Sequence, residues 1–166
     1  MLDALAVINR VIAEHHVIRK HVKLTGDAVN DIEALFTIQR TQSGWSQSSI
    51  TALTEKLTQL LQAFSFLEEG LKNHFSFEEK ALPPLFGDLL MKAILHAHHL
   101  ISKQLESTKT TIANTKLEGL NQRELLSKRS IIQQNINNLS QVVEEHAHHE
   151  EIILDIMKKA LEENKA

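Results

Sequence analysis

The sequence predicts an all-α protein, an up-down-up-down bundle of four long helices. Apolar residues recur in steps of three and four along four separate stretches, which is the spacing of one face of an amphipathic helix. The 166 residues include only five glycines and two adjacent prolines, so the chain has few places to turn. With 42% hydrophobic residues, the chain is long enough to bury a core unaided. We therefore expect a single domain spanning residues 1–166.

The first two helices are bracketed by polar turns and by proline. The first is expected from Asp3 to about Arg40, with Thr25-Gly26 as the place where it could break. Residues 41–46 form a polar turn, and the hydroxyl groups of Ser46 to Ser49 could cap the second helix. That second helix is expected to end at Pro83-Pro84, because proline disfavours a helical residue before it.

The last two helices have capping residues at their starts. The third is expected to start near Asp88, a suitable N-cap residue, and to fade around Asn114. Asn121 is followed three residues later by Glu124, and this pair resembles a capping box for the fourth helix. The fourth helix is then expected to run almost to the end of the sequence.

Polar residues interrupt the four apolar stripes at one level of the predicted bundle. Four histidines occupy positions where Leu or Ile would be expected, and two of them precede a glutamate by four residues. Residues four apart share one helix face, so each such pair aims an imidazole and a carboxylate at the same point. Buried carboxylates are costly without a partner and repel one another, so this core calls for metal cations. The six candidate metal ligands are His15, His74, Glu78, His98, His146 and Glu150.

The remaining histidines lie beside the stripes, and most are expected to face solvent: His16, His21, His96, His99, His148 and His149. Two of these could still reach the site. His149 lies on a face similar to that of His146, and His99 could replace His98 if the third helix is rotated.

Several glutamates are expected to lie outside the set of ligands. Glu79 and Glu151 could accept hydrogen bonds from imidazole N–H groups of the ligands. The Glu68-Glu69 and Glu144-Glu145 pairs are most simply interpreted as solvated faces.

The amino-acid composition limits which metal ligands and which kinds of catalytic chemistry are possible. Cysteine is absent, which excludes disulfides, thiolate ligands and cysteine nucleophiles. Imidazole and carboxylate together suit Fe, Mn or Zn. A ferritin-like site would need two E-x-x-H motifs and two further glutamates, and in the relevant helices only Glu145-x-x-His148, off the stripe, has that spacing. Tyrosine is absent, so tyrosyl-radical chemistry is excluded.

The net charge and the hydropathy of the sequence indicate which partners and which cellular location to expect. A formal net charge of −3 without a dense basic stretch argues against nucleic acid as a partner. No apolar stretch approaches the length of a transmembrane helix, so no membrane partner is expected. Residues 1–14 lack the basic and apolar regions of a signal peptide. Together with the absence of cysteine, this predicts a cytoplasmic location.

The pattern resembles the hemerythrin-like, HHE cation-binding family of up-down four-helix bundles with a non-heme di-iron centre. The resemblance covers nearly the whole chain and is most specific at His74-x-x-x-Glu78-Glu79, with Leu82-Pro83, and at His146-x-x-x-Glu150-Glu151. Within the family the chain looks more like the iron–sulfur cluster repair and nitric oxide response branch than like the oxygen carriers. An oxygen carrier would have a second histidine one turn after His98, where this chain has Ser102.

The resemblance implies that Glu78 and Glu150 bridge two iron ions joined by an oxo or hydroxo group, with the four histidines as terminal ligands. Zn or Mn is the alternative metal. It also implies a protein that binds, senses or responds to O2, NO or oxidative stress, with support of iron delivery or iron–sulfur cluster repair as related roles. The alternatives are a di-iron enzyme that reduces peroxide or NO, and a structural bundle that holds zinc. No further acid, base or phosphate loop accompanies the ligands, which favours binding and sensing over turnover.

Overall fold

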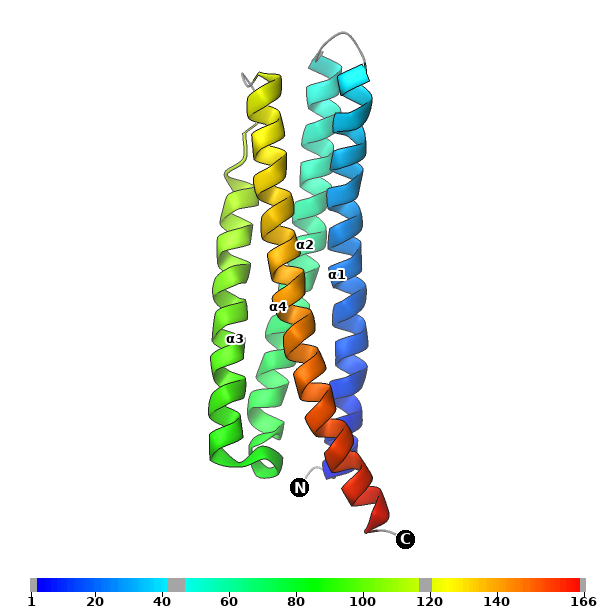
Figure 1. Cartoon of the computed structure of the whole chain (residues 1–166), viewed down its shortest axis with the longest axis vertical. Helices are drawn as coiled ribbons and strands as arrows, with labels where there is room; N and C mark the ends of the chain where they lie inside the picture. The colour runs from blue at the N-terminus through cyan, green and yellow to red at the C-terminus, as the bar shows by residue number, and fades with distance from the viewer. Residues whose placement is uncertain (1–2, 42–46, 117–120, 165–166) are drawn as a thin grey trace.

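The computed structural model describes residues 3–41, 47–116 and 121–164, and these residues form four long helices that lie side by side (Figure 1). Helix α1 spans Ala4–Thr41, α2 spans Gln47–Ala81, α3 spans Pro83–Ala113 and α4 spans Gln122–Glu163. Contacts join α1 to α2 and α4, and they join α3 to the same two helices. The predicted up-down-up-down bundle is therefore confirmed, and both ends of the chain lie at one end of it (Figure 1).

The start of α4 has the predicted capping box. The backbone N–H of Glu124 donates to the side-chain oxygen of Asn121 at 2.9 Å, and the N–H of Asn121 donates to the Glu124 carboxylate at 3.2 Å. These two bonds satisfy N–H groups that the first turn of a helix otherwise leaves free. The proposed cap of α2 involves Ser46 and the side chains of Ser48 and Ser49, which lie outside the described part of the structure.

The third helix begins earlier than the sequence predicts, at Pro83 instead of near Asp88. Pro83 begins α3, but Gly87 has φ of 71° and ψ of 175°, which interrupts the helix. A residue with a Cβ would be strained at this φ, so glycine suits the position. The predicted start near Asp88 is therefore wrong for α3 as a whole, and it coincides only with the part of the helix that follows the interruption at Gly87.

The expected weak point of α1 does not break. The helix is continuous through Thr25-Gly26, so this prediction is wrong. Thr25 is buried, and its hydroxyl donates to the backbone carbonyl of His21 at 2.8 Å. That bond satisfies the polar group within the helix, and the buried side chains of Thr25 and Val29 keep this turn packed on the core despite the low helix propensity of Gly26.

The buried apolar residues form two clusters, one on each side of the level where the six candidate ligands lie. On α2, for example, Leu71 belongs to the larger cluster and Leu82 to the smaller one, with His74 and Glu78 between them. The same order recurs on α4, where Val143 and Leu154 belong to the two clusters. The polar level is therefore enclosed by hydrocarbon along the bundle axis.

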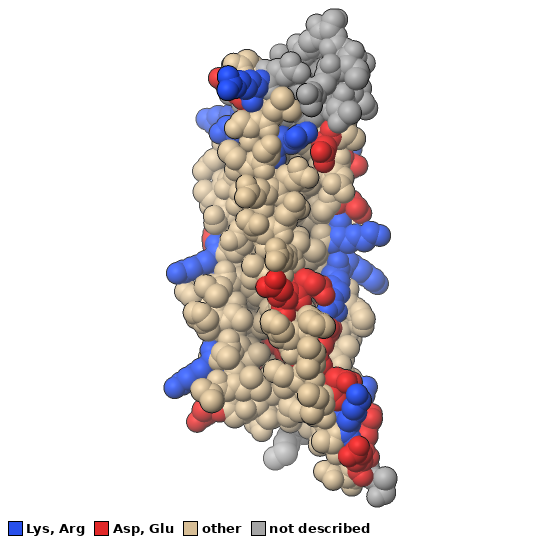
Figure 2. All heavy atoms as spheres, viewed as in Figure 1, with Lys and Arg blue, Asp and Glu red and all other residues tan. Residues whose placement is uncertain are grey.

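None of the helices in the described ranges carries an apolar stretch long enough to cross a bilayer. On the face shown in Figure 2, Lys and Arg residues lie mainly along the two sides and at the upper end, and a group of Asp and Glu residues lies near the middle of the face.

Candidate metal centre

All four helices contribute to the candidate site, and the structure brings the six predicted residues together. His15 comes from α1, His98 from α3, and each of α2 and α4 supplies one histidine and the glutamate four residues later. Five of the six are buried to 3% exposure or less, and His146 is slightly more open. The spacing of four residues is what places both side chains of a pair on the inner face of one helix.

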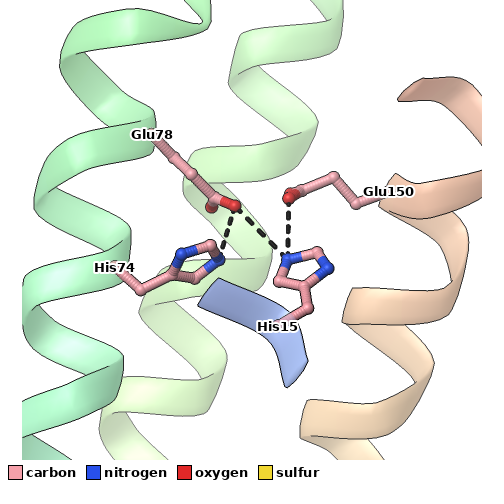
Figure 3. Close-up of side chains that lie close together, drawn as sticks. All are labelled: His15, His74, Glu78 and Glu150. Carbon is pink, nitrogen blue, oxygen red and sulfur yellow. Dashed lines mark ion pairs between the residues drawn. The ribbon is translucent and has the colours of Figure 1, made fainter. Parts of the chain in front are cut away.

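The six residues form two overlapping groups. One contains His15, His74, Glu78 and Glu150, which converge from three helices (Figure 3). The other contains the same two glutamates together with His98 and His146. In each group the ligand atoms lie within 4.8 Å of one another. Both carboxylates are thus shared between two pairs of imidazoles.

The two oxygens of each carboxylate face different histidines. Glu78 Oε1 lies 2.6 Å from His74 Nε2 and 3.5 Å from His15 Nε2, whereas Glu78 Oε2 lies 2.9 Å from His98 Nε2. Glu150 Oε1 lies 3.2 Å from His15 Nε2, and Glu150 Oε2 lies 3.3 Å from His146 Nε2. Each carboxylate therefore presents one oxygen to each imidazole pair.

Most of these inward-facing atoms lack a hydrogen bond, although they lie close together. Folded proteins rarely bury polar atoms without a partner, so a concentration of them at one point requires an explanation. Cations between the imidazole nitrogens and the carboxylate oxygens would satisfy all of them, and the donor set therefore fits metal ions. At this level of the bundle, the buried atoms that form no hydrogen bond are His15 Nε2, His74 Nε2, His146 Nε2, Glu78 Oε1 and both carboxylate oxygens of Glu150.

The imidazoles and carboxylates strongly perturb one another. Burial alone would lower the pKa of His15, but its contacts with Glu150 and Glu78 outweigh burial and raise the pKa to about 10. Burial lowers the pKa of His146 to about 4, and the nearby His98 acts in the same direction.

The two carboxylates shift in opposite directions. Burial raises the pKa of Glu150 to about 8 despite its contact with His15, and the neighbouring Glu78 adds to the increase. Burial also favours the neutral form of Glu78, but the imidazoles of His15, His74 and His98 outweigh it and hold the pKa well below its usual range. Without a cation, the charges at this level can be balanced only by protons held between the side chains.

Three of the four imidazoles are oriented from outside by a carboxylate. The outer nitrogens, Nδ1, of His15, His74 and His98 lie 3.2, 3.3 and 2.9 Å from oxygens of Glu151, Glu14 and Glu79, respectively. A carboxylate that accepts from Nδ1–H leaves the Nε2 lone pair facing inward. The expected roles of Glu79 and Glu151 agree with these contacts. Glu14 was not predicted, because it meets His74 from a helix 60 residues away.

The alternative histidines stay outside both groups. His99 and His149 are exposed, as are His16, His96 and His148. His21 is half-buried and stacks against Phe66, with ring centroids 6.5 Å apart. These placements agree with the apolar register from which the six candidates were chosen.

Two features of the surroundings differ from expectation. Glu68 does not lie on a solvated face, because its side chain is only 12% exposed and contacts both Lys72 and Lys109. Burial would raise the pKa of Glu68, but the two lysines outweigh it and lower the pKa.

Phe75, which was not predicted to belong to the site, stacks on His98 with ring centroids 3.9 Å apart.

Four antiparallel helices with two imidazole pairs and two shared carboxylates at one level define a helical bundle able to hold metal ions. The chain belongs to the hemerythrin HHE cation-binding domain family, whose family model matches residues 6–154. That range contains all six candidate ligands, and membership implies metal-ion binding. No curated protein and no solved structure matches the chain.

Proposed function

We propose that the chain holds two iron ions between its four helices and uses them to bind or sense O2 or NO. The observation that carries this proposal is the division of the carboxylate oxygens. Glu78 and Glu150 each offer Oε1 toward His15 or His74 and Oε2 toward His98 or His146. A single cation beside His15 and His74 would still leave His146 Nε2 and Glu150 Oε2 buried without a hydrogen bond, whereas two cations would engage every inward-facing atom.

The composition of the ligand set supports iron. Each cation would meet two imidazole nitrogens and two carboxylate oxygens, with the carboxylates shared. Histidine and carboxylate ligands with free coordination positions are typical of non-heme iron sites that react with oxygen. Iron bound in this way would supply redox chemistry and open positions for a small ligand. The chain itself orients the imidazoles through Glu14, Glu79 and Glu151, and its two apolar clusters enclose the site along the bundle axis.

The space beside the site supports a very small ligand. A cavity of about 10 Å³ borders His15, His74 and His146, and its other walls include Ile18, Leu71 and Ile101. A volume of this size is about that needed for one water-sized molecule. The apolar walls favour a neutral diatomic molecule over an organic substrate. This favours binding or sensing of O2 or NO over turnover of a larger molecule.

The test is elemental analysis of protein from iron-rich culture, combined with absorption spectra in air, after dithionite and after NO. We expect two irons per chain, a near-ultraviolet charge-transfer band in air that is lost on reduction, and new absorption after NO is added. Glu78→Ala and Glu150→Ala should each lose iron, because each carboxylate serves both positions, while His16→Ala should retain it. His16 is a matched control because it is exposed and adjacent to His15.

Three outcomes would contradict parts of this proposal. Isolation of the protein without iron, or with zinc alone, would show that it has no di-iron centre. Spectra that do not change with NO or O2 would show that the protein does not sense these molecules. Repeated consumption of peroxide or NO by the reduced protein would identify an enzyme instead.

A further inference from the structure

The two imidazole pairs differ in what holds them from outside. On α1, Arg19 lies one turn after His15 and forms two bonds to Glu151 of α4, from Nη1 to Oε1 at 2.7 Å and from Nη2 to Oε2 at 2.9 Å. Glu151 Oε1 is the atom that lies 3.2 Å from His15 Nδ1. Arg19 also binds Glu144 of α4 through Nε at 2.9 Å. The paired geometry of a guanidinium and a carboxylate is stronger and more specific than a single contact. His15 is therefore held by a carboxylate that is itself fixed.

The second imidazole of this pair has a similar arrangement. His74 Nδ1 lies 3.3 Å from Glu14 Oε1, and the other oxygen of Glu14 accepts from Arg10 Nε at 3.0 Å. The Arg10 guanidinium lies over the ring of Phe77, 3.7 Å from its centroid, in a cation–π contact. The outer nitrogens of both His15 and His74 therefore contact a glutamate that is itself bound by an arginine.

The opposite pair has weaker support. His98 Nδ1 lies 2.9 Å from Glu79 Oε1, but the Glu79 side chain is 42% exposed and has no Lys or Arg partner among the described residues. His146 has no carboxylate at its outer nitrogen in the described part of the chain, and its side chain is 10% exposed. The corresponding exposures of His15 and His74 are 0% and 2%.

Solvent also approaches the two pairs differently. An open pocket of about 370 Å³ between α2 and α3 is lined by Phe75, Glu79 and His98, together with residues of the surface such as Lys72 and His99. A chelator or water in this pocket would lie against the His98 ring and its outer carboxylate. His15 and His74 instead border the much smaller cavity of about 10 Å³.

On the basis of the proposed function, we infer that the two metal positions are not equivalent. The position at His15 and His74 holds its cation more tightly, and the position at His98 and His146 releases its cation first and reloads last. Arg19–Glu151 and Arg10–Glu14 are positioning pairs that act through the imidazoles. Loss of such an outer partner commonly lowers metal affinity by about 10–100-fold. The protein can therefore exist with one cation in place, which suits a role in giving up or exchanging one metal ion.

The experiment uses Co²⁺ as the probe, so that its result does not depend on which metal the cell supplies. The full chain is stripped with a chelator, dialysed and loaded with two Co²⁺, and the visible absorption of bound Co²⁺ is followed after EDTA is added. We expect two phases of equal amplitude, one fast and one slow. Glu151→Gln should speed the slow phase about 10–100-fold and leave the fast phase unchanged.

The matched control is Glu79→Gln, which removes the outer carboxylate of His98. It should speed the fast phase and leave the slow phase as in the wild type. Circular dichroism of both stripped variants should match that of the stripped wild type, because a merely structural effect would alter both phases. Release of both Co²⁺ in a single phase, or faster release of only the early phase in Glu151→Gln, would overturn the inference while leaving a two-metal site. A chain that binds no Co²⁺ would overturn the inference and the metal site together.

Discussion

Removal of the bound metal ions should destabilise the fold severely, because the six buried ligand atoms of the site that lack hydrogen-bond partners would then have no cation to bind. A buried polar group left unpaired costs about 1–3 kcal/mol. We take about 1 kcal/mol for each, since their mutual close contacts offset part of the cost, and obtain about 6 kcal/mol. The whole free energy of unfolding of a protein is only about 5–15 kcal/mol. The metal-free protein should therefore be close to its stability limit.

This free energy converts into a measurable shift in the melting temperature. A domain of this size loses about 2–4 °C for each kcal/mol, so stripping the metal should lower Tm by about 12–24 °C. The assay is thermal unfolding followed by circular dichroism on the isolated protein, on chelator-stripped protein after dialysis, and on stripped protein with Fe²⁺ restored under anaerobic conditions. Coincident melting curves for the loaded and stripped forms would refute the reasoning, because the buried ligands would then be satisfied without a cation.

Three further outcomes are expected. His15→Ala should lower the metal content, whereas His16→Ala should leave it unchanged, as measured by elemental analysis; the reverse result would show that the register of α1 is wrong. Gly87→Ala should destabilise the fold by about 1 kcal/mol or more, because φ is positive at this position. An unchanged free energy of unfolding, measured by urea denaturation, would contradict this. Metal affinity should rise with pH, because the raised pKa values of His15, about 10, and Glu150, about 8, mean that a cation must displace protons held by the metal-free site. Proton release on metal addition in weakly buffered solution measures this, and an affinity that stays constant as the pH rises toward 8 would contradict it.

The apolar periodicity was sufficient to predict the fold and the convergence of the candidate ligands. His74 and Glu78 lie between buried Leu71 and Leu82 in one stripe, so the helix geometry alone turns both side chains inward. The same reasoning left exposed His16 out of the site. These predictions depend only on the rotation of each helix about its own axis, which the apolar residues fix.

Contacts between helices were harder to predict. Glu14 and Arg19 reach partners on other helices, and their choice of partner depends on how far each helix is shifted along the bundle. Glu68 is covered by Lys109 from α3, so its burial cannot be seen from the neighbouring sequence. The continuous α1 at Gly26 has a similar cause, because packing along a long helix overrides the local preference of one residue.

Whether two iron ions lie between the four helices can be seen in a crystal structure of the iron-loaded protein, with anomalous scattering data collected at the iron edge. We expect two anomalous peaks inside the bundle, one beside His15 and His74 and the other beside His98 and His146, with Glu78 and Glu150 each directing one oxygen to each peak. A single peak, or density in which the two carboxylates turn away from each other, would contradict it.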